Sequence, residues 1–200
     1  MSARASKPDS DRCRSRLAGV PLVLGVTGSI AAYKAAELVR LLVMEGARVH
    51  VVMTGSATRL VAPATFRVLS GNPVGVSLFS EPRRFEAQHV ALAEDCRAVV
   101  VAPATANLLG KVACGIADDL LTTVIIAAAA RRPVVLAPAM NAGMYLNPVV
   151  QENLAKLRRL GYRVVGPVRG PLASGADGEG RLAPLEDIVD EVVRAVSGEG

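Results

Sequence analysis

Five short runs rich in apolar, β-branched residues recur along the chain, and segments with helical spacing separate them. The runs cover residues 20–26, 47–53, 97–102, 132–137 and 162–167. Apolar residues repeat at helical spacing between the first two runs, and again near 64–70, 106–116, 118–130, 147–160 and 184–196. Apolar strands that alternate with helices predict an α/β fold, a doubly wound and mostly parallel sheet with helices on both faces.

The length and the charge of the chain limit its organisation. Its 200 residues, 51% of them hydrophobic, suffice for one domain that buries most of its surface. We expect residues 1–18 to form a disordered basic tail and residues 19–200 to form that domain. Residues 1–19 hold five basic against two acidic residues, so this end carries most of the formal net charge of +5. Only 3% of the residues are aromatic, which argues against a nucleic-acid binder.

The sequence indicates neither a membrane span nor a disulfide or metal framework. The basic tail followed by the apolar run LAGVPLVLGV imitates a signal peptide, but this run leads through a glycine turn into an amphipathic helix, as a first strand does. The longest uncharged helix-like run, 120–130, is too short for a bilayer. Cys13, Cys96 and Cys114 are odd in number and lack CxxC spacing. We therefore expect a cytoplasmic protein without a bound metal.

Small and hydroxyl residues follow the first two strands. Gly28 and Ser29 stand where the chain turns into a helix, and backbone N–H groups at a helix start bind phosphate readily. The spacing matches neither the dinucleotide nor the P-loop fingerprint, and Ser29 fits a plain helix N-cap as well as a phosphate ligand. The second strand ends in hydroxyl residues, of which Thr54 and Ser56 are two. If these two strands are adjacent, the pair of turns favours a monophosphate group.

The third and fourth strands end in PATAN, residues 103–107, and PAMN, residues 138–141. PATAN fits a proline turn with an asparagine helix cap as well as a ligand site. In the second motif an apolar strand runs directly into Met140 and Asn141, which favours a bound ligand. Met140 can lie on a flat ring, and the amide of Asn141 can hold a carboxylate.

Taken together, GSIAAYK at 28–34, QHVALA around His89, PATAN, ADDLL at 117–121 and PAMNxxMY resemble one protein family. It is the family of homo-oligomeric FMN-containing cysteine decarboxylases, which includes phosphopantothenoylcysteine decarboxylase and peptidyl-cysteine decarboxylases. The resemblance runs in order from about residue 20 to 196. It implies a Rossmann-like flavoprotein with FMN as cofactor, assembled into a homotrimer or a dodecamer of trimers.

The resemblance also implies roles for individual residues. His89 matches the active-site histidine and Asn141 the asparagine that grips the substrate carboxylate, with Met144 and Ser174 also facing the substrate. His50, which lies mid-strand, is interpreted as structural. The residues implied to bind FMN are Gly28, Ser29, Ile30, Thr54, Ser56 and Ala57 around its phosphate, and Thr105, Ala106, Asn107, Leu108, Ala139 and Met140 against its ring.

A flavin would meet a chemical need of cysteine decarboxylation. An α-carboxylate cannot leave cysteine directly, because the electrons of the breaking bond have nowhere to go. Loss of a hydride from Cβ of the thiolate to oxidised FMN gives a thioaldehyde, which accepts those electrons as carbon dioxide departs and an enethiolate remains. An imidazole such as that of His89 is suited to taking the thiol proton at neutral pH.

The glycine-rich segment at about 168–184 resembles the family's substrate-covering flap, with Ser174 where the family pattern has cysteine. A thiol, with a pKa of about 8.5, can protonate the enethiolate, and a serine hydroxyl is a far poorer acid. We therefore expect oxidative decarboxylation of a C-terminal cysteine on a precursor of a ribosomal peptide antibiotic, with an enethiol as the product.

Two alternatives to this expectation remain. One is phosphopantothenoylcysteine decarboxylase of coenzyme A biosynthesis, to which PATANLLGKVACGIADDLL is more similar. The other is a non-catalytic FMN-binding regulatory subunit, which the presence of both His89 and Asn141 disfavours. Flavin prenyltransferases share the fold, but they lack the pairing of PAMN with the histidine.

Overall fold

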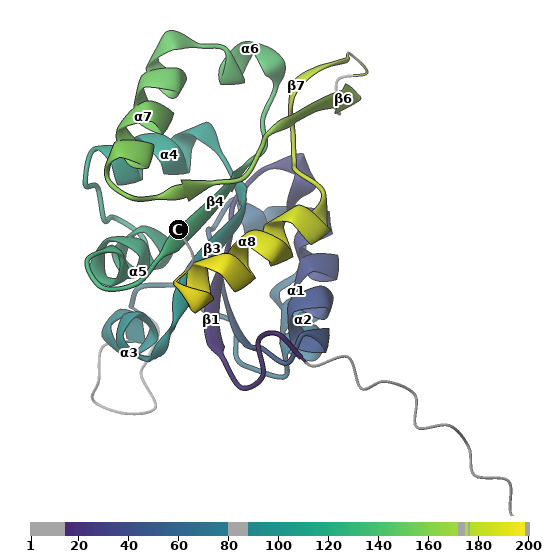
Figure 1. Cartoon of the computed structure of the whole chain (residues 1–200), viewed down its shortest axis with the longest axis vertical. Helices are drawn as coiled ribbons and strands as arrows, with labels where there is room; N and C mark the ends of the chain where they lie inside the picture. The colour runs from purple at the N-terminus through teal and green to yellow at the C-terminus, as the bar shows by residue number, and fades with distance from the viewer. Residues whose placement is uncertain (1–14, 80–87, 172–174, 176, 199–200) are drawn as a thin grey trace, which may run out of the picture.

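A five-stranded parallel sheet forms the centre of the computed structural model, which describes residues 15–79, 88–171, 175 and 177–198 (Figure 1). The strand order is β2-β1-β3-β4-β5. The strands are β1 (Pro21–Val26), β2 (Arg48–Met53), β3 (Ala98–Ala104), β4 (Val134–Pro138) and β5 (Arg163–Val164). The predicted α/β fold is confirmed, and so is the predicted adjacency of the first two strands.

Helices cover both faces of this sheet (Figure 1). One face carries α1 (Lys34–Met44), α2 (Pro63–Ser70) and α8 (Leu185–Ser197). The other carries α3 (Gln88–Asp95), α4 (Ala106–Ala113), α5 (Leu120–Ala129) and α7 (Pro148–Arg159). Because successive side chains of a strand point to opposite faces, Leu22 and Leu24 join the first core and Val23 joins the second.

The order of the strands reverses beside β1, which places a crevice at the C-terminal edge of the sheet. Leu24 pairs with Val51 of β2 on one side and with Val100 of β3 on the other. The chain leaves β1 toward α1 on one face, and it leaves β3 toward α4 on the opposite face. Such a point of divergence is where open α/β sheets bind their ligands.

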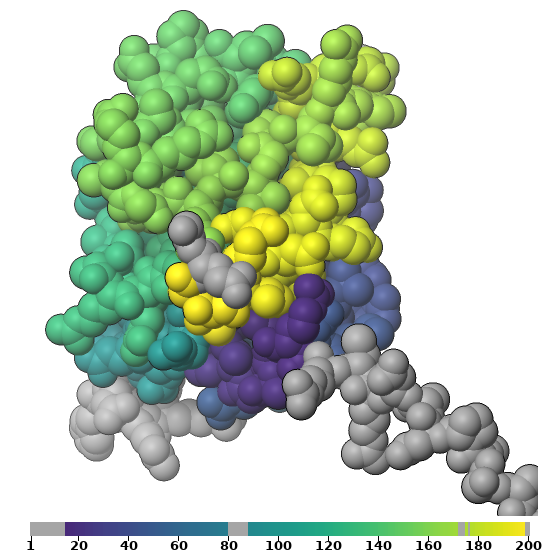
Figure 2. Space-filling view, viewed as in Figure 1, coloured from purple at the N-terminus to yellow at the C-terminus, as the bar shows by residue number. Residues whose placement is uncertain are grey.

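A second, two-stranded sheet stands apart from the main one. It is the antiparallel hairpin of β6 (Val168–Pro171) and β7 (Asp177–Arg181). The segment at about 168–184, which was expected to form a flap, thus contains two paired strands that the sequence analysis did not predict. In the space-filling view the C-terminal residues form a band from the hairpin over α8 (Figure 2). Ser174 lies outside the described residues.

Several smaller features also differ from the predictions. The helix expected over 106–116 ends at Ala113, and α3, α6 (Ala142–Tyr145) and two 3-10 helices, η1 (Ile30–Tyr33) and η2 (Ala57–Arg59), were not predicted. The boundary expected at residue 18 is too late, because Leu17 is fully buried and Arg16 pairs with Glu45 and Asp190 at 2.7 and 2.6 Å. The rest of the expected tail, residues 1–14, is outside the described part. No described helix is long and apolar enough to cross a membrane.

Candidate active site

Two adjoining cavities lie at the C-terminal edge of the sheet, with volumes of about 560 and 610 Å³. The first, here called the Asn141 cavity, is lined by Asn141 and by residues of the hairpin. The second, the Lys111 cavity, is lined by Lys111 and by the turn after β2. Both are lined by Gly28, Thr105 and Met144, so together they offer one continuous site. Each volume is in the range typical of small-molecule sites.

The turns after β1 and β2 are in close contact, and this contact requires a glycine. A Cβ atom built on Gly28 would lie 2.5 Å from Cβ of Ser56. Ser29 caps η1, because its Oγ accepts a hydrogen bond from the N–H of Ala31 at 3.4 Å, and Thr54 Oγ1 accepts one from the N–H of Ala57 at 3.3 Å. Ser29 is therefore an N-cap, as one interpretation held, and its hydroxyl can still donate to a phosphate oxygen.

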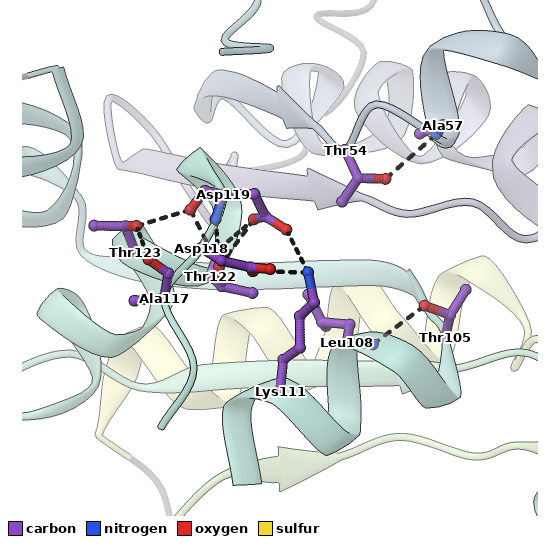
Figure 3. A network of polar contacts seen from close by, with 10 residues as sticks. All are labelled: Thr54, Ala57, Thr105, Leu108, Lys111, Ala117, Asp118, Asp119, Thr122 and Thr123. Carbon is purple, nitrogen blue, oxygen red and sulfur yellow. Dashed lines mark hydrogen bonds and ion pairs between the residues drawn. The ribbon is translucent and has the colours of Figure 1, made fainter. Parts of the chain in front are cut away.

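A buried hydroxyl links the turn after β1 to the turn after β3. Thr27 is 1% exposed, and its Oγ1 donates to the carbonyl of Pro103 at 2.7 Å and accepts from the N–H of Thr105 at 3.1 Å. Thr105 in turn caps α4 by accepting from the N–H of Leu108 at 3.4 Å (Figure 3). The two turns that line both cavities are thus fixed relative to each other.

Lys111 reaches from α4 to the start of α5 (Figure 3). Its Nζ lies 2.7 Å from Oδ1 of Asp118 and 3.3 Å from Oδ2 of Asp119. Asp119 is the N-cap of α5 and forms a capping box with Thr122, whose N–H donates to Asp119 Oδ1 at 2.8 Å. The hydrogen bond to Asp118 raises the pKa of Lys111 and lowers that of Asp118, so Lys111 is charged at neutral pH. Among the described residues that line this cavity, Lys111 and Arg59 are the cations and Asp119 is the one carboxylate.

The side-chain amide of Asn141 is oriented by its own backbone. Asn141 caps α6, and its Oδ1 accepts a hydrogen bond from the N–H of Gly143 at 2.8 Å. Among the described residues, no group accepts a hydrogen bond from its NH₂ group. The amide oxygen is therefore occupied while both N–H donors stay available, which is the arrangement that a carboxylate ligand needs.

The hairpin is attached to the PAMN segment at one point. The N–H of Met140 donates to the carbonyl of Gly180 at 2.9 Å. Gly180 has φ +137°, and a Cβ atom built on it would lie 2.2 Å from the carbonyl oxygen of Met140. A glycine is therefore required here, because only it lets β7 come close enough to form one wall of the Asn141 cavity.

Most residues expected at the site come together around these cavities. The Asn141 cavity is lined by Gly28, Ser29, Ile30, Thr105, Ala106, Ala139, Met140, Asn141 and Met144, and the Lys111 cavity adds Thr54, Ser56, Asn107 and Leu108. Their individual roles stay predictions.

Two expected site residues, Ala57 and His89, line neither cavity, and a third lies outside the described part of the chain. Ala57 is fully buried in η2, so at most its backbone can contribute. His89 lies in α3, which packs against α5, and it lines neither cavity of this chain. Ser174 is outside the described residues.

Sequence reasoning missed several residues that the structure adds to the site. They include Thr27, Lys34, Arg59, Lys111, Asp119 and Arg181. Lys111 and Asp119 lie within segments that carry the family resemblance. That resemblance was the only feature of the sequence that could have pointed to them as site residues.

The donors of the two cavities fit FMN. Hydroxyls and cations of the Lys111 cavity suit a phosphate group, whereas Ala139, Met140 and Met144 offer apolar surface for a flat ring. The contact between Gly28 and Ser56 keeps the two phosphate-side turns close together.

Comparison with known proteins agrees with this geometry. The family model described as Flavoprotein matches residues 11–197. The chain is 48% identical over 171 residues to the coenzyme A biosynthesis bifunctional protein CoaBC of Vibrio cholerae, covering 85% of this chain but only 42% of that protein. It is 42% identical over 171 residues to a probable phosphopantothenoylcysteine decarboxylase of Streptococcus mutans, covering 86% of this chain and 96% of that one.

Two solved structures are similar throughout. One is a cysteine-to-serine mutant of a PPC decarboxylase complexed with pantothenoylaminoethenethiol, with a TM-score of 0.78, 31% identity and coverage of 87% and 96% of the two chains. The other is the FMN-dependent cysteine decarboxylase SpaF, with a TM-score of 0.78, 34% identity and coverage of 92% and 98%. The chain therefore belongs to the Flavoprotein family, and the resemblance to its FMN-dependent cysteine decarboxylases is confirmed.

Proposed function

We propose that this chain is an FMN-dependent decarboxylase of 4′-phosphopantothenoylcysteine, a step of coenzyme A biosynthesis. One observation carries the choice of substrate: the 42% identity to the probable phosphopantothenoylcysteine decarboxylase of Streptococcus mutans extends over 96% of that protein. The CoaBC protein of Vibrio cholerae, at 48% identity, supports the same substrate, although the chain spans only about two fifths of its length. This proposal adopts one of the two alternatives from the sequence analysis, phosphopantothenoylcysteine decarboxylase, in place of the expected peptidyl-cysteine substrate.

A specific observation keeps the expected oxidative outcome as a second candidate. Ser174 stands where the family pattern has cysteine. The solved cysteine-to-serine mutant of a PPC decarboxylase is complexed with pantothenoylaminoethenethiol, an enethiol. A serine in place of the cysteine is thus compatible with a pantothenoyl substrate. Ser174 therefore bears on whether the product is an enethiol or a saturated thiol, and it does not decide which substrate is used.

Different residues of the two cavities would bind the substrate and the cofactor. The NH₂ group of Asn141 would bind the carboxylate that leaves as carbon dioxide. FMN, when bound, supplies a two-electron acceptor that activates the cysteine for decarboxylation. Its phosphate would be held by the hydroxyls of Ser29 and Thr54 and by the cations Arg59 and Lys111.

The catalytic base is proposed to come from a neighbouring subunit. His89 lines neither cavity of its own chain, so a trimer in which His89 of the partner subunit reaches the Asn141 cavity would complete the site. Mixed assemblies test this arrangement. His89→Asn and Asn141→Ala chains, each inactive alone, should regain part of the wild-type activity when they are refolded together. No recovery in verified mixed assemblies would contradict a shared site.

Mass spectrometry of the products tests the reaction and its substrate. The FMN-loaded protein is incubated with 4′-phosphopantothenoylcysteine and, separately, with a peptide ending in cysteine. In the presence of oxygen, which would reoxidise the reduced FMN, we expect turnover of the first only, with loss of carbon dioxide plus two hydrogens if Ser174 cannot support return of the hydride. Ser174→Cys should shift the product toward loss of carbon dioxide alone.

Two variants and one outcome complete this experiment. His89→Asn should bind FMN but lose turnover, whereas His50→Asn, which changes the half-buried histidine of β2, should keep it. Turnover of the peptide alone would refute the proposed substrate and restore the peptidyl-cysteine interpretation. No turnover of either substrate would favour the regulatory-subunit alternative.

A further inference from the structure

The Asn141 cavity has an unbalanced positive charge. Among the described residues that line it, Lys34 and Arg181 are the cations, and none is an aspartate or a glutamate. A cavity of this composition favours a ligand that carries negative charge. Because the amide of Asn141 is neutral, a carboxylate bound to it would offset only one of these two positive charges.

Arg181 differs from the other arginine of the same hairpin. Arg169 pairs with Asp177 through a contact of 3.2 Å between Nε and Oδ1. Arg181 has no carboxylate within ion-pair distance in the described part of the chain, and it lines the cavity. Its side chain crosses Gly170, where Nη1 and Cδ lie 3.0 and 3.1 Å from the position a Cβ atom would take. The missing side chain at Gly170 therefore gives the guanidinium its place beside the cavity.

Arg181 is also held in a fixed relation to the proposed carboxylate anchor. The hydrogen bond between Met140 and Gly180 joins the PAMN segment to β7. Asn141 and Arg181 are the residues that follow these two partners in the chain, and both line the same cavity. Two ligand-binding groups therefore stand beside the hydrogen bond between Met140 and Gly180. They are the amide of Asn141, which suits a carboxylate, and the guanidinium of Arg181, which suits a second anionic group.

We propose that Arg181 is a specificity-determining residue that binds the phosphate of the substrate, at the end remote from the reacting cysteine. This inference rests on the proposed function. The planar guanidinium can form two parallel hydrogen bonds with a phosphate, which a lysine cannot do. The backbone of a cysteine-terminated peptide offers no dianion to this position, so Arg181 favours the phosphorylated substrate over a peptide.

Binding of two products tests the role of Arg181. Dissociation constants of 4′-phosphopantetheine and pantetheine are measured calorimetrically on the FMN-loaded wild type and on Arg181→Gln, Arg181→Lys and Arg169→Gln. The ratio of the two constants reports phosphate recognition alone. We expect Arg181→Gln to weaken the phosphorylated ligand roughly 10- to 100-fold and to leave pantetheine unchanged, the loss expected of charge-assisted hydrogen bonds. Arg181→Lys should fall between, and Arg169→Gln should behave as the wild type.

The outcomes separate this inference from the function on which it rests. Equal weakening of both ligands, an unchanged ratio, or the same effect in Arg169→Gln would overturn the role of Arg181. FMN content is measured by absorbance in every variant, and its loss in Arg181→Gln would assign the residue to the cofactor instead. Decarboxylation of 4′-phosphopantothenoylcysteine is measured in the same series. Failure of the wild type in that assay refutes the proposed function, whereas wild-type turnover with an unchanged ratio refutes only the inference.

Discussion

Replacing Gly28 by alanine tests whether the contact between the first two turns builds the cofactor site. The new Cβ atom would lie 2.5 Å from Cβ of Ser56. Carbon atoms in contact lie about 3.5–4.0 Å apart, so the two turns must separate by about 1–1.5 Å. Both atoms are attached directly to backbone, so rotating a side chain cannot relieve the clash.

The expected cost follows from that displacement. A misplacement of about 1 Å can lower a catalytic rate on the order of 100-fold, and we take the same factor for the loss of FMN affinity. We therefore expect the dissociation constant of FMN to rise about 100-fold, equivalent to about 2.7 kcal/mol. Overpacking should also lower the free energy of unfolding of the apoprotein by roughly 1–3 kcal/mol.

Quenching of flavin fluorescence on titration of the apoprotein measures this affinity, and urea denaturation measures the stability. Gly110→Ala is the matched control, because its Cβ would meet only Nδ2 of Asn153, at an ordinary 3.7 Å, and α4 should gain roughly 0.5–1 kcal/mol. The control should bind FMN as the wild type does. Gly28→Ala binding FMN within about threefold of the wild type would refute the reasoning, because the turns would then have separated at no cost to the site.

Two further predictions concern the hairpin and the half-buried histidine. Gly180→Ala should detach β7 from Met140, lower the free energy of unfolding by on the order of 2 kcal/mol and weaken substrate binding while FMN stays bound. Gly161→Ala is the control, because Gly161 also has a positive φ of +87° but no neighbour within 4 Å. Urea denaturation measures the stability and steady-state kinetics the KM, and this control should keep the KM of the wild type. Burial and the nearby Arg48 lower the pKa of His50 below its ordinary 6.5, so its contribution to stability is present above pH 6.5 and is lost as the pH falls through the lowered value. His50→Gln should flatten the loss of stability between about pH 7 and 5, and an unchanged slope in urea midpoints would show that another group titrates.

The main sheet could be predicted because burial on both faces requires apolar strands, which periodicity detects. Gly28 and Asn141 could be found because they stand directly after such strands. The β6–β7 hairpin could not be found in this way, since its strands VRGP and DGEGR are held by backbone pairing and by the close approach of Gly180 to Met140. Neither of these leaves an alternating pattern in the sequence.

The remaining site residues depend on tertiary contacts. Lys111 and Arg181 reach the cavities through long side chains from segments that are distant in the sequence. Ala57 was placed at the phosphate by resemblance, but its side chain is buried and its N–H is already bonded to Thr54. His89 was matched to the family's active-site histidine from the sequence. Its position relative to the cavities follows from the packing of α3 against α5, which sequence motifs do not encode.

The single oxygen of Thr27 has a consequence for anyone who redesigns this cofactor site. It ties the loops that begin the two opposite layers of the protein, so they behave as one mechanical part. A substitution in the turn after β1 that is intended to change phosphate binding will also displace the turn after β3, which is expected to lie beside the flavin ring. Tuning one end independently would first require replacing that hydroxyl, and with it the only buried link described between these two loops.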